Sequence, residues 1–132
     1  MTKDLHHRIN TFLSLAPIKC TTTTNGTVID TKGYESVEIL YVIGQSGDTL
    51  GSSVKITPSL QDSDASDSGF TDTTEIIGEL TVIDSADKDE VIQRIGYKGR
   101  KRYLKPILTF TGTHTNGTPC SIVAVLGHAR RG

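Results

Sequence analysis

The stretch "YLKPILTFTG", residues 103–112, decides the fold class because its side chains alternate between two sides. One side carries Leu104, Pro106, Leu108 and Phe110, and the other carries Tyr103, Lys105, Ile107 and Thr109. A period of two is the pattern of a β-strand with one side in a hydrophobic core. We therefore predict a strand here, with Leu104, Leu108 and Phe110 in the core.

Comparable stretches recur along the chain. They are "YESVEILYVIG" (residues 34–44), "VKITPSLQ" (54–61), "VIQRIGYKG" (91–99) and the closing "CSIVAVLGHARRG" (120–132). The 13 Gly, 4 Pro and absence of Trp agree with short strands, many turns and a core of Val, Ile and Leu. About seven or eight closely spaced strands predict an all-β fold, an antiparallel β-sandwich or a jelly-roll-like barrel.

Two local signals refine this prediction. Asn25-Gly26 separates two stretches rich in β-branched residues, which is a strong turn signal. Pro58 lies inside an alternating stretch, and a proline cannot donate to a neighbouring strand. The strand around Pro58 is therefore expected at a sheet edge or at a bulge.

The length of 132 residues fits one domain with a single core. We expect a β-sandwich domain over residues 16–132, preceded by an N-terminal arm over residues 1–15. Leu5, Ile9 and Phe12 share one helical stripe in that arm, which indicates either a short helix or an extended docking arm. On either alternative, these three side chains are candidate protein contacts.

Charge is distributed very unevenly. Residues 1–90 contain six Lys or Arg against fifteen Asp or Glu, a balance of −9. Residues 91–132 contain eight Lys or Arg and no acidic residue, a balance of +8. This asymmetry indicates two electrostatic faces or head-to-tail contact with further copies of the chain. The formal net charge of −1 argues against a nucleic-acid partner.

A basic run begins the strand quoted above. Five cationic side chains fall within eight positions: Lys98, Arg100, Lys101, Arg102 and Lys105. Tyr97 and Tyr103 flank the run, as stacking aromatics do in nucleic-acid binders. Gly96 and Gly99 instead predict a tight turn. On this interpretation, the basic side chains lie at the turn of a hairpin between strands at residues 91–97 and 103–111. The charge balance favours an acidic protein surface as the partner, and residues 62–90 of the chain itself are one such surface.

Two polar loops lack a complete catalytic or metal-binding motif. "GQSGDTLGSS" (44–53) has neither the Lys before its Ser pair nor the following helix that a phosphate-binding loop needs. "DSDASDSG" (62–69) lacks the sixth-position Gly and the twelfth-position Glu of an EF-hand calcium loop. We therefore expect no enzymatic activity, no catalytic residue, no metal site and no cofactor.

Cys20 and Cys120 lie far apart in the sequence. The start of the chain lacks the apolar region of a secretion signal, so buried or free thiols are favoured. A long-range disulfide and an intersubunit disulfide remain the alternatives. No stretch approaches the roughly 18 apolar residues of a membrane-spanning helix, and no membrane partner is expected.

Four stretches together resemble small structural proteins of tailed bacteriophages, which are found near the major capsid protein. They are "TNGTVIDTKGYESVEILYVIG", "ITPSLQDSDASDSGFTD", "YKGRKRYLKPILTFTGT" and "SIVAVLGHARR". The resemblance extends from about residue 14 to residue 131. It is a pattern of strands and turns and includes no catalytic signature.

This resemblance implies a non-enzymatic head decoration (cement) or head-spike-base protein with a β-sandwich or jelly-roll fold. Such a protein is made in the cytoplasm of the host bacterium and resides in the virion, on the capsid surface or in the neck. It implies homo-oligomers that bind the major capsid protein or neck proteins, with the N-terminal arm clasping a neighbour. The alternative is a carbohydrate-binding or host-adhesion β-sandwich, with Tyr97, Tyr103 and Phe70 as stacking residues.

Overall fold

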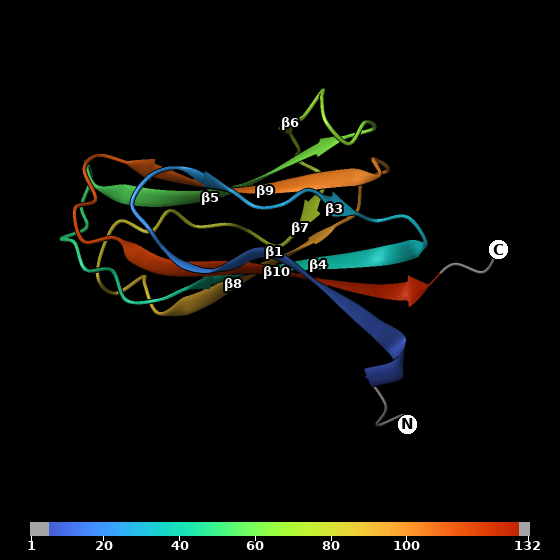
Figure 1. Cartoon of the computed structure of the whole chain (residues 1–132), viewed down its shortest axis with the longest axis horizontal. Helices are drawn as coiled ribbons and strands as arrows, with labels where there is room; N and C mark the ends of the chain where they lie inside the picture. Colours follow the sequence, from blue (N-terminus) through green and yellow to red (C-terminus); the bar gives the residue numbers. More distant parts are fainter. Residues whose placement is uncertain (1–5, 130–132) are drawn as a thin grey trace.

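The computed structural model of the chain describes residues 6–129, which form a sandwich of two antiparallel β-sheets (Figure 1). After a 3₁₀ turn, η1 (His6–Arg8), the elements are β1 (Ile9–Cys20), β2 (Thr24–Asn25), β3 (Ile29–Asp30), β4 (Tyr34–Ile43), β5 (Lys55–Ser63), β6 (Thr71–Asp72), β7 (Ile76–Ile77), β8 (Val91–Tyr97), β9 (Tyr103–Thr111) and β10 (Thr118–Ala129). The all-β sandwich prediction is confirmed.

The strands form two layers. The first sheet has the order β1-β10-β4-β8-β7. The second has the order β2-β9-β5-β6, and β3 also pairs with β9. Four of the ten strands in the described residues have only two residues, which is too short for an alternation to be recognised in the sequence.

The core fills the space between the sheets mostly with aliphatic side chains, together with Tyr41, Tyr97, Phe110 and the two cysteines. Strand β9 contributes Leu104 and Leu108, both fully buried, as its alternation predicts. Tyr41 of β4 is also fully buried, and its hydroxyl donates a hydrogen bond to the Ser59 carbonyl of β5 at 2.8 Å. Burial raises the pKa of Tyr41 above its ordinary value. This hydrogen bond satisfies the phenol inside the core and links the two sheets.

The position of β5 agrees with the expectation from Pro58. Along its whole length β5 pairs with β9 on one side. On its other side β5 pairs with β6 only at Gln61 and Asp62, and Ile56 forms an isolated bridge with Ile83. Over most of this side no neighbouring strand accepts a hydrogen bond from a β5 backbone N–H. A proline, which has no backbone N–H, is tolerated at such a position.

The hairpin predicted across the basic run is wrong. The two strands have the predicted bounds, residues 91–97 and 103–111, but β8 belongs to the first sheet and β9 to the second. Residues 98–102 therefore cross from one layer to the other. Because the inward sides of β8 and β9 face the same core from opposite layers, alternation alone does not distinguish this arrangement from a hairpin.

The turn predicted at Asn25-Gly26 is not a hairpin turn either. Thr24 and Asn25 pair with β9, and Ile29 and Asp30 pair farther along the same strand. Gly26 continues this edge by donating its N–H to the Pro106 carbonyl at 2.8 Å. The chain therefore follows β9 and leaves it only briefly around residue 27.

The N-terminal segment pairs with the first sheet from Ile9 onward. Strand β1 runs antiparallel to β10, with register shifts on either side of Leu15. The extended alternative for the arm therefore holds over Ile9–Leu15, and the helical element is limited to the 3₁₀ turn at His6–Arg8. The expected arm boundary at residue 15 falls inside β1.

Candidate protein-docking surface

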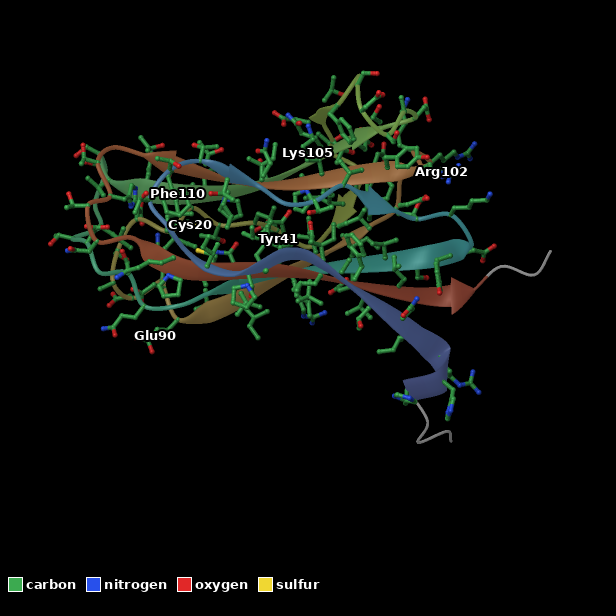
Figure 2. The ribbon with its side chains drawn as sticks, viewed as in Figure 1. Cys20, Tyr41, Glu90, Arg102, Lys105 and Phe110 are labelled. Atoms are coloured by element: carbon green, nitrogen blue, oxygen red, sulfur yellow. The ribbon has the colours of Figure 1, made fainter. Side chains whose placement is uncertain are left out.

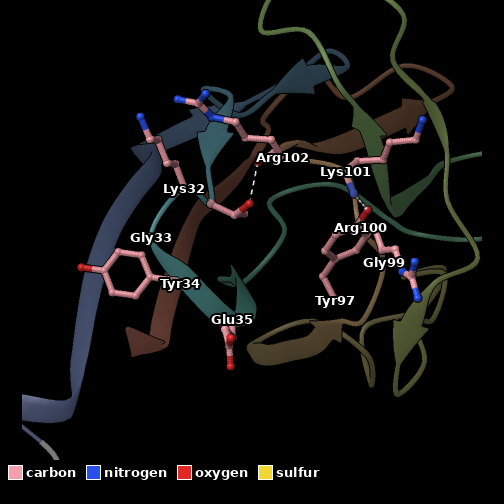
Figure 3. Close-up of a pocket in the computed structure, with 10 residues that line it drawn as sticks. Lys32, Gly33, Tyr34, Glu35, Tyr97, Gly99, Arg100, Lys101 and Arg102 are labelled. Carbon is pink, nitrogen blue, oxygen red and sulfur yellow. Dashed lines mark hydrogen bonds between the residues drawn. The ribbon is translucent and has the colours of Figure 1, made fainter. Parts of the chain in front are cut away.

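The basic connection, residues 98–102, lies at one end of the sandwich, between β8 and β9. The turn between β3 and β4, residues 31–33, lies across from it. This turn, residues 99–102 of the basic connection, and Tyr34, Glu35 and Tyr97 line a polar hollow of about 200 Å³ (Figure 3). This end of the molecule is the candidate site, because it gathers the basic side chains that the sequence singled out.

Tyr97 fixes the start of the basic connection. Its hydroxyl donates to Asp62 Oδ2 at 2.7 Å and accepts the Lys101 N–H at 3.0 Å. Burial, and then the Asp62 carboxylate, raise the pKa of Tyr97. Gly99 lies so close to the Tyr97 ring that a Cβ at this position would collide with it. The connection is therefore held by a buried hydrogen-bond network and by a close glycine contact.

Arg102 forms an ion pair with a carboxylate of the same chain. Its Nε and Nη2 donate to the two carboxylate oxygens of Asp30 at 2.7 and 2.8 Å, a bidentate ion pair. Hydrogen bonding to Arg102 lowers the pKa of Asp30 to about 2. The backbone N–H of Thr31 and its hydroxyl both donate to the Arg102 carbonyl, at 3.0 and 2.7 Å. These contacts link the basic connection to the turn between β3 and β4, on the other side of the hollow.

Two more of the five cations also contact groups of the same chain. Lys101 Nζ donates to Asp64 Oδ2 at 2.8 Å. Lys105 Nζ lies 4.3 Å from the centre of the Phe70 ring, within cation–π distance. Asp64 and Phe70 belong to the segment between β5 and β6, so the acidic loop following β5 supplies part of the acidic surface expected for the basic run.

Lys98 and Arg100 are the two cations of the basic run that the contacts above do not include. Both side chains are exposed, and neither forms an ion pair with any residue that the structure describes. In Figure 3 the Arg100 side chain points away from Arg102 and Lys101. These two cations are thus the members of the basic run left to contact another molecule.

The candidate contacts of the N-terminal segment lie in different environments. Leu5 is outside the described residues. Ile9 is partly exposed at the start of β1, whereas Phe12 is partly buried and packs against the core. Phe12 therefore stabilises the core of its own chain, whereas Ile9 can contact a neighbouring subunit.

The cysteines lie on adjacent strands and are both buried free thiols, 5% exposed for Cys20 and 3% for Cys120. Cys20 pairs in register with Thr118, and Cys120 with Ile18. Burial, and then the neighbouring Cys20, raise the pKa of Cys120 to about 12. An intersubunit disulfide through either thiol would require β1 to separate from the body of the sandwich.

Sequence reasoning missed the carboxylates that neutralise the basic run. Asp30 and Asp64 lie 72 and 37 residues before their partners Arg102 and Lys101. Asp62 begins the polar stretch "DSDASDSG", yet it is buried and its carboxylate accepts a hydrogen bond from Tyr97. The only signal in the sequence was the abundance of acidic residues before residue 91, which does not specify individual pairs.

No model of a known protein family matches the chain, and no curated protein matches it. Among the residues that the structure describes, no group of three or more His, Cys, Asp or Glu side chains could hold a metal ion. The same part of the chain contains no helix that is long and apolar enough to cross a membrane.

Proposed function

We propose that this chain is a non-enzymatic structural protein of a tailed-bacteriophage virion that binds the capsid or neck through protein–protein contacts. The sequence resemblance supports this assignment, and the sandwich is compatible with a decoration (cement) or spike-base role. Its contact surface is the end of the sandwich that carries the basic connection. Its partner there is an acidic surface of the major capsid protein or of a neck protein.

The proposal depends on one observation: some cations of the basic run are paired within the chain, whereas others are exposed and unpaired in the described residues. Arg102 and Lys101 are bonded to Asp30 and Asp64, so they fix the connection in place. Lys98 and Arg100 extend from this fixed connection without an ion pair of their own in the described chain. Two exposed cations on a preorganised loop lose little conformational freedom when they meet carboxylates of a partner.

No specific observation favours the carbohydrate-binding alternative. Tyr97 is only 7% exposed, with its hydroxyl bonded to Asp62. The Tyr103 ring lies beneath the Arg102 guanidinium at 4.9 Å, and the Phe70 ring lies beneath Lys105 at 4.3 Å. One side of each ring is therefore already occupied by a cation.

Binding to phage particles that lack the chain tests the proposal. Purified wild-type protein should co-sediment with such particles. The double variant Lys98→Glu/Arg100→Glu should bind at least about tenfold more weakly at physiological salt, because two attractive contacts become repulsive.

The matched control is Lys19→Glu/Lys55→Glu, which also reverses two positive charges. These residues lie at the opposite end of the sandwich, opposite Pro119 and Thr111 in their strand pairings. The control should bind like the wild type. Equal binding by both double variants, or no binding by the wild type, would refute the proposal.

A further inference from the structure

The outward sides of the two sheets differ in chemistry. On the second sheet the outward rows of β5 and β9 pair Thr57 with Thr109, Gln61 with Lys105, and Ser59 with Ile107. These rows are mostly polar, as expected for a sheet side that faces water. The corresponding side of the first sheet is mostly apolar, and this contrast needs a physical explanation.

On the first sheet, rows of paired residues cross four strands. One outward row joins Leu13 of β1, Val123 of β10 and Leu40 of β4. The adjacent row joins Val42 of β4 to Ile92 of β8. These five side chains, together with Val125 next to Val123 on β10, are named the apolar face here.

The apolar face is uncovered in the described chain. Leu13 is 53% exposed and Ile92 is 61% exposed, and the four other members are partly exposed. Figure 1 shows no further layer of the chain on the outer side of this sheet. Scattered exposed aliphatic residues are ordinary, but a contiguous apolar patch across the middle of a sheet marks an interaction surface.

The charges beside the apolar face indicate which partner fits it. Arg94 Nη1 lies 2.9 Å from Glu38 Oε2, and these are the charged residues of its outward rows on β4 and β8. Arg94 stands directly opposite Leu40, and Glu38 directly opposite Val125. The pair is neutral as a whole, so it offers no net attraction to a strongly acidic or basic partner.

The Glu38–Arg94 pair also fits a second copy. With a two-fold axis in the plane of the interface, midway between Glu38 and Arg94, each Arg94 would lie over the Glu38 of the other copy, so the charges are self-complementary. The same operation stacks two apolar faces as the layers of a sandwich pack, about 10 Å apart. A copy related in this way buries the exposed Leu13 and Ile92 of both chains.

We propose that the apolar face is a two-fold homodimer interface, in which Leu13, Leu40, Val42, Ile92, Val123 and Val125 pack against the same residues of a second copy. The interface is separate from the basic connection, which stays free in the dimer. The inference therefore stands or falls independently of the virion role.

The test is the mass of the purified chain in solution, measured by sedimentation equilibrium over a dilution series. The wild type should have twice the 14.2 kDa mass of one chain, or another even multiple, and should dissociate on dilution. Leu13→Glu and Ile92→Glu should each raise the dissociation constant about 100-fold or more, because each places a carboxylate in the apolar interface.

Two controls separate loss of the interface from loss of the fold. Ile18→Glu changes a residue of β1 that is 56% exposed and lies outside the apolar face, so this variant should remain dimeric. Thr57→Glu places the same charge on the outward side of the second sheet and should also remain dimeric. Both interface variants change exposed side chains and should keep the circular dichroism spectrum of the wild type.

A charge swap tests the two-fold arrangement itself. Glu38→Arg alone should weaken the dimer, and combining it with Arg94→Glu should restore most of the affinity, because the exchanged pair is again self-complementary. A monomeric wild type, an assembly with an odd number of chains, or interface variants that assemble like the wild type would each overturn the proposal.

Discussion

At the scale of single residues, Gly26 shows how closely the edges of the two sheets approach. Thr27 donates its N–H to the Ser14 carbonyl at 2.6 Å, and the Ser14 hydroxyl donates to the Thr27 carbonyl at 2.7 Å. Ser14 belongs to β1 of the first sheet, while residues 24–30 line the edge of the second. Gly26 has no side chain that could obstruct these hydrogen bonds.

Gly26→Ala should therefore destabilise the fold. A Cβ at this position would collide with Ser14 Oγ and lie 2.9 Å from Pro106 Cγ. We expect the free energy of unfolding to fall by about 1–3 kcal/mol, the range for inserting a methyl group into a packed site. Urea unfolding measures the change. The control is Gly51→Ala, where nothing lies within 4 Å of the added Cβ, and a loss as large in the control would contradict the interpretation.

Asp30 gives the fold a specific acid dependence. Its folded pKa of about 2 lies below the ordinary value of 3.8, so its ion pair with Arg102 stabilises the fold above pH 3.8 and this stabilisation is lost as the pH falls through 2. Asp30→Asn should lower the free energy of unfolding at neutral pH by up to about 1 kcal/mol, because the pair is nearly half exposed.

The difference between Asp30→Asn and the wild type should shrink as the pH falls from 3.8 toward 2. Urea unfolding of both proteins across this interval measures it. A difference that stays constant, or grows, on acidification would show that Asp30 contributes through something other than its charge.

At the scale of elements, alternation predicted the strands but not their partners. Strands β8 and β9 have the bounds expected from the sequence, and the inward residues of β9 are those that its alternation selects. Alternation says which side chains face the core, but both layers face the same core. The layer of each strand, and hence the connection at residues 98–102, depended on tertiary packing.

Strand β1 is the element whose opening would expose the cysteines. Cys120 has a pKa raised to about 12 mainly by burial, and the thiolate is the reactive form of cysteine. In the native protein both thiols should therefore react with Ellman's reagent far more slowly than a free thiol. In concentrated urea both should react rapidly. Rapid reaction under native conditions would show that β1 separates readily from β10.

At the scale of the whole molecule, the charge split in the sequence is partly neutralised by folding. Asp30 and Asp64 come from the acidic part of the chain and pair with Arg102 and Lys101 from its basic part. The basic run therefore carries less free charge than its five cations suggest from the sequence alone. Which acids reach which bases depends on the sheet-to-sheet connections, which no local pattern encodes.

The two proposed contact surfaces occupy different parts of the molecule. The basic connection ends at Arg102, which lies at one end of the sandwich, and Glu90 lies toward the opposite end (Figure 2). The apolar face covers the outward side of β1, β10, β4 and β8. A dimer formed through this face leaves both basic connections accessible, so the protein can bind a particle through two copies at once.

A reconstruction by electron cryomicroscopy of the phage particle that carries this chain tests the central claim most directly. The account predicts a β-sandwich bound to the capsid or neck, with Lys98 and Arg100 within ion-pair distance of carboxylates from a neighbouring subunit. A particle without this sandwich, or one in which the basic connection faces solvent while another surface forms the contact, would contradict it.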